Sequence, residues 1–470
     1  MYLNKEKIPD RFSTGKDCFM LRQVKFLLSV WILALCFLCP AQENKPKYIF
    51  LFIGDGMSVP QRMVAEEFSL KNGGTPLVIN HLTCHATTRT RSADSLVTDS
   101  AASGTALACG VKTNNGMLGV SPDGTKLESS AAVAKRTGKK VGIVTSVPLN
   151  HATPAAFYAH RQSRGSYYGI CRDLAASGFD FFAGGGLLQA DGGSKKQPVN
   201  AYELIAKSGY TVIQNDRDAF LKLRPGCGKV FFSAEPDEPG IIGYAIDRKD
   251  GEISLDELTA KGIELLDNPD GFFMMVEGGA IDWAGHSNDA AANLREVLEM
   301  DKAVQCAIRF AERRPGETLI VVTGDHETGG MTMGFAGTGY ALHMDILAGQ
   351  KCSWNVFAKK LSEAKKADPK FDFEKAQTLL HENFGFAFSS GESGIPLEKK
   401  EIATLKKAFD QNRLPAEARK LLDNKAGIGW TTGAHSALPV LTTSTGCGSE
   451  KFTGFIDNTD VARNIKSLLE

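Results

Sequence analysis

The chain has 470 residues, of which 54 are lysine or arginine, 54 are aspartate or glutamate, and 43% are hydrophobic. This length is enough to bury a large core. Because binding to a phosphate backbone requires an excess of clustered basic residues, the balanced charge gives no footprint for nucleic acid.

The N-terminus has the pattern of a secretory signal. Arg22 and Lys25 precede an apolar run over 26–38, and small residues follow it. A basic start, a short apolar core and a small-residue exit predict a signal peptide at 1–41, with residues 1–19 as an extension from an upstream start. The run is too short for a comfortable membrane span, and no later run is longer. We therefore expect a periplasmic or secreted protein with no membrane span in its mature form.

The cysteines number ten, and seven lie beyond Ala41, after which we expect cleavage. Lipidation at Cys36 or Cys39, or an uncleaved signal, is the alternative. An odd, scattered set in an exported protein permits disulfides but leaves at least one thiol over. Because these seven form no C-x-x-C pair, the sequence does not favour a thiolate zinc site.

Short β-rich apolar runs alternate with helical segments over 42–470. This pattern predicts an α/β domain with a mainly parallel central sheet and helices on both faces. The strands are expected at 47–53, 140–146, 179–183, 272–276 and 319–323. The helices are expected at 61–70, 127–136, 201–208 and 288–311. No linker rich in proline or serine divides this length, so we expect one domain.

The composition of the sequence changes at 348–425. Lysine-rich helical segments occur there, at 354–367 and 396–409, with acidic and apolar positions interleaved. This pattern predicts a helical insertion with a solvated face. A lid over the site or a contact with a second subunit is the alternative role.

Possible metal ligands follow the ends of four predicted strands. In chain order they are Asp55, then His151 and Thr153, then Glu277, Asp282 and His286, and finally Asp325 and His326. Ligands bind beyond the carboxyl ends of the strands in open α/β sheets. We therefore expect these side chains to meet at one edge of the sheet.

A serine among small residues stands out in the segment 97–106. Ser100 comes directly after Asp99, where a helix is expected to begin. Free N–H groups at a helix start suit a phosphate, and a serine hydroxyl becomes a nucleophile when a base or a metal ion removes its proton. An ordinary capped helix start explains the segment equally well when it is taken alone.

Each histidine or acid taken alone could have an ordinary structural role, but together they are consistent with metal binding. Asp282 and His286 are four residues apart, which places them on one face of a helix. His435, in the loop 432–436, is a ligand candidate or an ordinary loop histidine. With the acids above and Ser100, these side chains supply nitrogen and oxygen ligands for more than one divalent ion.

This ordered set closely resembles the alkaline phosphatase family. The resemblance runs from about Lys47 to the C-terminus, with one large helical insertion. The motifs that carry it are Ile-Gly-Asp-Gly-Met at 53–57, the serine motif at 97–105, His-Ala-Thr-Pro at 151–154, the segment 276–286, Asp325-His326, and His435. It implies the family's α/β fold with a crown-like insertion, hydrolysis of small phosphate monoesters, and a homodimer.

The resemblance also implies two zinc ions and one magnesium ion. The implied ligands of the first zinc are Asp282, His286 and His435. Those of the second zinc are Asp55, Asp325 and His326, completed by Ser100 in the free enzyme. Those of magnesium are Asp55, Thr153 and Glu277, with His151 at the edge of the site.

The implied reaction is an in-line attack by Ser100 that forms a phosphoserine intermediate, with an alkaline optimum. Arg164, eleven residues after Thr153, falls at the position of the family's phosphate-clamping arginine. A guanidinium can hold two non-bridging oxygens at once.

The chain departs from the best-known pattern at two positions. His151 stands where some members have aspartate, which leaves the identity of the third metal open. Trp283 stands where some members have lysine or histidine. Our hypothesis is that the absence of a cation at Trp283 weakens product binding and speeds product release.

Three other functions compete. A phosphodiesterase or phosphonate hydrolase of the same superfamily would use the same metals, but Arg164, Thr153 and Glu277 favour a small, highly charged terminal phosphate. A sulfatase is disfavoured because the serine motif has no Cys/Ser-x-Pro-x-Arg sequence. A non-catalytic, exported metal-binding surface protein is disfavoured because every expected position of the site is filled.

Overall fold

The structure is a computed structural model that describes residues 45–235 and 240–470. The predicted signal peptide at 1–41 lies outside the described residues. Within the described part, every helix is too short or too polar to cross a lipid bilayer. The seven cysteines beyond Ala41 are all free thiols, so the disulfides that the sequence permits are not formed.

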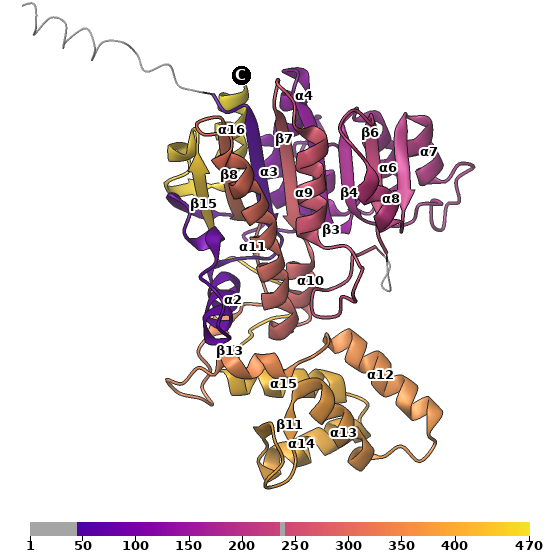
Figure 1. Cartoon of the computed structure of the whole chain (residues 1–470), viewed down its shortest axis with the longest axis vertical. Helices are drawn as coiled ribbons and strands as arrows, with labels where there is room; N and C mark the ends of the chain where they lie inside the picture. Colours follow the sequence, from indigo (N-terminus) through magenta and orange to yellow (C-terminus); the bar gives the residue numbers. More distant parts are fainter. Residues whose placement is uncertain (1–44, 236–239) are drawn as a thin grey trace, which may run out of the picture. The chain divides into compact units, whose positions relative to one another are not determined.

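A ten-stranded sheet forms the centre of the described part, in the order β16-β2-β15-β8-β1-β7-β3-β4-β6-β5 (Figure 1). Its strands are β1 (Tyr48–Gly54), β2 (Cys84–Arg89), β3 (Lys140–Pro148), β4 (Phe181–Gly185), β5 (Tyr210–Gln214), β6 (Lys229–Ser233), β7 (Phe272–Gly278), β8 (Thr318–Gly324), β15 (Val440–Gly446) and β16 (Gly454–Asp457). The central strands β8, β1, β7 and β3 are parallel, and β15 runs antiparallel to β8 and β2. The predicted, mainly parallel sheet is confirmed.

Helices cover both faces of the sheet. They are α2 (Val59–Lys71), α3 (Ser100–Cys109), α4 (Ser130–Arg136), α5 (Ala152–Ala155), α6 (Tyr167–Ala176), α7 (Ala201–Lys207), α8 (Arg217–Lys222), α9 (Leu255–Leu266), α10 (Ala280–His286), α11 (Ala290–Glu312) and α16 (Asn458–Leu469). Successive residues of β1 join different cores: Phe50 packs with the apolar residues of α9 and α11, and Leu51 with those of α3 and α16. Burial on both faces explains why the central strands are continuous apolar runs.

Several element boundaries differ from the sequence prediction by one to three residues, and three of them have a clear local cause. The helix expected at 127–136 begins at Ser130, because the side chain of Ser129 accepts a hydrogen bond from the N–H of Ala132 and caps it. The helix expected at 396–409 begins at Lys399, because Glu398 forms a capping box there. The strand expected at 179–183 begins two residues later, where pairing with β3 and β6 starts.

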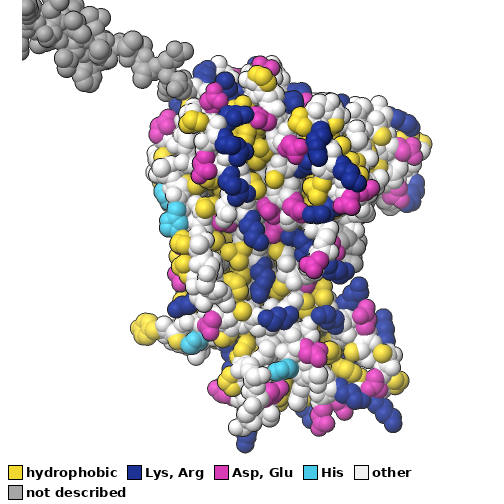
Figure 2. Space-filling model, in the orientation of Figure 1, with side chains coloured by type: hydrophobic (Ala, Val, Ile, Leu, Met, Phe, Trp, Pro, Cys, Tyr) yellow, Lys and Arg dark blue, Asp and Glu magenta, His cyan; other side chains and the backbone are white. Residues whose placement is uncertain are grey.

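The segment 348–425 is mainly helical. It contains α12 (Trp354–Ala367), α13 (Phe373–Phe384), the short strands β11 (Phe386–Ala387) and β12 (Ile395–Pro396), α14 (Lys399–Asp410), and most of α15 (Leu414–Ala426). Figure 2 shows basic and acidic side chains interspersed over the visible face of these helices and of the sheet-bearing part. Asp289, which caps α11, accepts hydrogen bonds from Gln350 Nε2 and from the N–H of Trp354, each at 2.9 Å. This carboxylate ties the insertion to the helix that follows α10.

Two small antiparallel pairs lie beyond the strand ends. β9 (Glu327–Thr328) pairs with β14 (His435–Ser436), and β10 (Thr332–Met333) pairs with β13 (Ile428–Gly429). The first pair brings the loop that carries His435 back to the end of β8. The second begins the segment that leads from α15 to the same place.

Candidate functional site

The ends of the central strands are level with one another. In the register of the sheet, Gly54 of β1 lies opposite Gly278 of β7 and Gly324 of β8. Asp55 and Asp325 directly follow two of these glycines. A Cβ atom on Gly324 would lie 2.1 Å from the carbonyl oxygen of Met57, so only glycine fits where the chain turns into the site. The predicted meeting of strand ends at one edge is therefore observed.

Ser100 is the first residue of α3. Asp99 is the N-cap: its side chain accepts a hydrogen bond of 2.9 Å from the N–H of Ala102. The small residues that follow are all buried, and Ser103 donates to the carbonyl oxygen of Asp325 at 2.5 Å. The serine hydroxyl is thereby held next to the end of β8.

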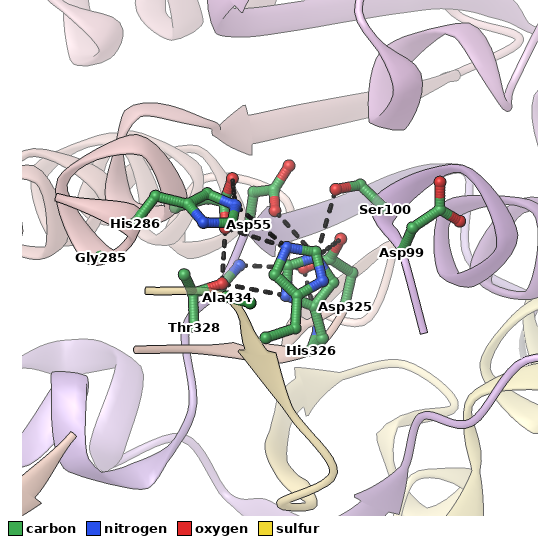
Figure 3. A network of polar contacts seen from close by, with 12 residues as sticks. Asp55, Asp99, Ser100, Gly285, His286, Asp325, His326, Thr328 and Ala434 are labelled. Carbon is green, nitrogen blue, oxygen red and sulfur yellow. Dashed lines mark hydrogen bonds and ion pairs between the residues drawn. The ribbon is translucent and has the colours of Figure 1, made fainter. Parts of the chain in front are cut away.

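Three oxygen atoms converge on one nitrogen atom at this point (Figure 3). Nε2 of His326 lies 3.2 Å from Ser100 Oγ, 3.3 Å from Asp55 Oδ1 and 3.2 Å from Asp325 Oδ2. Neither of these two carboxylate oxygens has a hydrogen-bond partner, and both side chains are fully buried. A single nitrogen cannot satisfy three oxygens, whereas a cation between them can. The group Asp55, Asp325 and His326 therefore has the form of a metal site.

Thr328 fixes the tautomer of His326. Its hydroxyl donates to Asp282 Oδ1 at 2.5 Å, and its oxygen lies 3.2 Å from Nδ1 of His326. Because the single hydroxyl hydrogen is used on Asp282, Nδ1 must be the donor of the second contact. The lone pair of Nε2 is then free to bind a metal.

Asp282, His286 and His435 form a second group with one ligand atom each in reach of the others. Nδ1 of His286 donates to the carbonyl oxygen of Gly433, and Nδ1 of His435 donates to that of Thr98, both at 2.8 Å. In a neutral imidazole, such a bond places the proton on Nδ1 and leaves a lone pair on Nε2, and the two Nε2 atoms face each other at 3.2 Å. Two lone pairs repel at this distance unless a cation lies between them, so this group is also suited to a metal.

Asp55, His151 and Glu277 form a third group, which shares Asp55 with the first. Thr153 Oγ1 donates to Asp55 Oδ2 at 3.1 Å, and Thr145 donates to Glu277 Oε2. The second oxygen of Glu277 is buried without a partner. Carboxylate and hydroxyl oxygens suit a hard cation such as Mg²⁺.

Burial changes the acid–base properties of these side chains. It raises the pKa of Asp55 and of Asp325 well above the ordinary value, and neighbouring carboxylates add to the rise. Burial raises the pKa of Glu277 to about 7 and lowers that of His326 well below its ordinary value. In the absence of a cation, these acids are more easily neutral and this imidazole is uncharged.

Arg164 lies on the side of Ser100 that faces the third group. Its Nη1 donates to Asp99 Oδ2, and its Nη2 donates to His151 Nε2, both at 3.1 Å. Burial and the positive charge of Arg164 lower the pKa of His151 to about 3, so this imidazole is neutral. The ring of Trp283 lies edge-on to that of His151, with the two centres 5.9 Å apart.

Every predicted site residue lies in or beside this network, but some members were not predicted. Asp99 holds Arg164, Thr328 joins the first and second groups, and Glu327 accepts hydrogen bonds from Gln61 and Ser436. The position of Asp99 directly before Ser100 was a usable signal. Threonine carries no charge or metal-ligand signature, so nothing in the sequence distinguished Thr328.

Comparison with known proteins agrees with this geometry. The sequence model of the alkaline phosphatase family matches residues 46–178 and 191–470. Alkaline phosphatase 4 of Bacillus subtilis is 32% identical, over 90% of this chain and 88% of its own length. The cold-active alkaline phosphatase of Shewanella sp. superimposes with a TM-score of 0.78 and 30% identity, covering 90% of this chain and 100% of that one. The enzyme from the Antarctic bacterium TAB5 has a TM-score of 0.65 and 26% identity, over 90% and 98% of the two chains. The chain belongs to the alkaline phosphatase family and is a phosphomonoester hydrolase.

Proposed function

We propose that the chain is an exported alkaline phosphatase that forms a phosphoserine intermediate on Ser100. The observation that carries this proposal is the convergence of Ser100 Oγ, Asp55 Oδ1 and Asp325 Oδ2 on Nε2 of His326, at 3.2–3.3 Å. The two carboxylate oxygens are buried without hydrogen-bond partners and need a cation, which would lie next to the serine oxygen.

The donor sets support two zinc ions and one magnesium ion. We assign one zinc to Asp282, His286 and His435, and the other to Asp55, Asp325 and His326, because imidazole nitrogen suits zinc. We assign magnesium to Asp55, Thr153 and Glu277. A variant of the TAB5 enzyme has Mg bound in a site named M3, which supports a magnesium site in this family. His151 at the edge of this group leaves the preferred third metal open.

When bound, these ions would supply positive charge that stabilises an ionised serine oxygen and the charge of the transferred phosphoryl group. Ser100 Oγ is the atom that attacks phosphorus, and its position at the start of α3 directs backbone N–H groups toward the phosphate. Asp99 and His151 occupy one amino group each of Arg164, which leaves the other N–H groups of the guanidinium free to hold phosphate oxygens.

Export, assembly and the role of the insertion belong to the same proposal. The basic and apolar pattern of 1–41 supports export to the periplasm or the exterior. The family relationship supports a homodimer and a crown-like role for the insertion 348–425.

The proposal is tested by phosphate release from an aryl phosphomonoester at pH 7 to 10, beside the matched diester. We expect monoester hydrolysis that increases with pH, disappears on chelation and returns when zinc and magnesium are both added. Faster hydrolysis of the diester would instead indicate a phosphodiesterase. No turnover of either substrate by the metal-loaded protein would contradict the proposal.

A further inference from the structure

A cavity of about 520 Å³ lies between α15 and the segment that follows β13. Its wall includes two cationic side chains, Arg419 and Lys420, and two aromatic ones, Phe335 and Trp430. Asn288, between α10 and α11, completes the wall on the side of the sheet. The proposed reaction uses none of these residues.

The cavity adjoins the group Asp282, His286 and His435. Asn288 donates from Nδ2 to the carbonyl oxygen of Thr432 at 2.8 Å, and His286 donates to that of Gly433 at 2.8 Å. The same loop therefore lines the cavity at Trp430 and carries His435 a few residues later. The side chain of His286 is 41% exposed, so the group opens to solvent at this ligand.

Neither cation of the cavity forms an ion pair with a carboxylate among the described residues, and Lys420 is exposed to solvent. Nε of Arg419 is buried without a hydrogen-bond partner, and the guanidinium carbon lies 5.7 Å from the centre of the Trp354 ring. Lys420 forms no hydrogen bond or ion pair with another residue in the described part of the chain. Two adjacent positive charges that form no ion pair can attract an anion.

Asp423, one helical turn beyond Arg419, does not supply the missing charge. It is fully buried, and its Oδ2 accepts a hydrogen bond of 2.8 Å from Nε1 of Trp430. Burial raises the pKa of Asp423 well above its ordinary value, although Arg419 acts in the opposite direction. The carboxyl group thus orients the indole, and it forms no ion pair with Arg419 in the described part of the chain.

The indole of Trp430 provides a flat apolar surface. A Cβ atom on Gly329 would lie 2.4 Å from Cε3 and Cζ3 of this ring, so the ring is seated directly on the backbone of Gly329. Because the indole of Trp430 packs against Gly329 and is hydrogen-bonded at Nε1, it is already fixed in position. This reduces the entropy cost of binding a flat ring against it.

We propose that this cavity binds the organic part of phosphomonoesters in which a flat ring system is joined to a second anionic group, as in nucleoside bisphosphates. The inference rests on the proposed function, which makes Ser100 the nucleophile, and on the position of the cavity beside the group Asp282, His286 and His435. The flat ring would lie against Trp430 and Phe335, and the second phosphate would face Arg419 and Lys420. The insertion then determines which phosphomonoesters are preferred.

The test is equilibrium binding to metal-loaded Ser100→Ala protein, which cannot turn the ligands over. Adenosine 3′,5′-bisphosphate, adenosine 5′-monophosphate and ribose 5-phosphate are titrated separately by calorimetry. We expect about tenfold tighter binding of the bisphosphate than of the monophosphate, and weaker binding still of ribose 5-phosphate. Adding Arg419→Gln and Lys420→Gln should remove the advantage of the bisphosphate.

The matched control adds Lys406→Gln and Lys407→Gln, which remove the same charge from exposed positions of α14. This control should keep the full preference, and Lys420→Gln alone should lose part of it. Equal affinity for all three ligands, or a preference that survives the change at Arg419 and Lys420, would overturn the proposal. Because binding does not depend on turnover, the result is read separately from a failure of the parent enzyme to hydrolyse an aryl phosphate.

Discussion

The carboxyl edge of the sheet buries its charged side chains, whereas the helical insertion exposes most of its charged side chains to solvent. At the edge, Asp55, Asp325 and His326 are completely buried, and one carboxylate oxygen of each aspartate has no hydrogen-bond partner. In the insertion, most lysines are exposed, and the helices begin with ordinary caps such as Ser353 and Asp372. Buried polar groups without partners are costly, so a fold retains them where a ligand completes them.

The difference separates two kinds of contribution to function. The edge is rigid because parallel strands and buried helices fix each ligand, and it is suited to the chemistry itself. The insertion is tied to this edge mainly through hydrogen bonds to Asp289 and through a shared core. Changes at the edge should therefore alter turnover and metal binding, whereas changes in the insertion should alter stability or substrate preference.

The largest effect is expected for Ser100→Ala. Removal of the attacking oxygen should lower kcat by about 10⁴-fold, while the metal content stays unchanged. Steady-state phosphate release and elemental analysis of the same sample check both statements. Ser467→Ala removes a hydroxyl that bonds only the carbonyl oxygen of Asn464 on the surface, and it should leave both quantities as they are.

Removal of the metals should destabilise the sheet edge more at high pH than at low pH. The raised pKa values of Asp55 and Asp325 mean that their neutral forms are compatible with the metal-free fold, and that this stability is lost as the pH rises through those values. Chelation should lower the free energy of unfolding by about 3 kcal/mol or more at pH 9, and by less at pH 6. Thermal unfolding with and without chelator measures the difference. An equal loss at both pH values would contradict this reasoning.

Thr328→Val should weaken the site without removing a ligand. The substitution keeps the volume but deletes the hydroxyl that contacts Asp282 and His326, and lost partners of metal ligands typically cost about 10- to 100-fold in metal affinity or activity. Zinc affinity measured by competition with a chromogenic chelator checks the effect. Thr328→Ser restores the hydroxyl and should recover most of the affinity; failure of this rescue would show that only packing matters at this position.

The Asp289→Ala variant tests how the helical insertion is connected to the carboxyl edge of the sheet. The variant loses the cap of α11 and the hydrogen bonds from Gln350 and Trp354, at a cost of about 2 kcal/mol. Chemical denaturation measures this loss. Because no ligand is removed, the zinc content should stay the same, and a parallel loss of zinc would mean that the insertion supports the metal site directly.

The smallest effect is expected for Trp283→Lys. A lysine near His151 and Arg164 would add a positive charge close to the phosphate, so inorganic phosphate should inhibit the variant a few-fold more strongly. Inhibition constants of the variant and the parent, measured in one buffer, provide the comparison. Equal inhibition constants would contradict the hypothesis that Trp283 weakens product binding.

Most residues at the carboxyl edge were predictable because they directly follow the ends of predicted strands. The apolar runs at 48–53 and 319–322, shortly before Asp55 and Asp325, indicated buried parallel strands, and such strands place their ends together. The start of α3 was predictable from Asp99, which is a typical cap. Helix starts at Ser130 and Lys399 were missed by about three residues, because an extended or turn conformation before each cap competes with helix propensity.

The remaining features depend on contacts that no local pattern encodes. Thr328 is significant only because Asp282 comes within 2.5 Å of its hydroxyl from another strand end. The cavity requires Asn288, Arg419 and Trp430 to meet, and these residues come from three separate elements. Such sites are determined by the packing of the insertion against the sheet edge.

The central claim is that the buried edge uses Ser100 to carry the phosphoryl group. The most direct measurement is peptide mass spectrometry of protein that has been mixed with an aryl phosphomonoester and quenched with acid. We expect phosphate on the peptide that contains Ser100 in metal-loaded protein and none after chelation. Turnover of the monoester with no phosphate on Ser100 under any quench time or pH, or with phosphate on another residue, would contradict the claim.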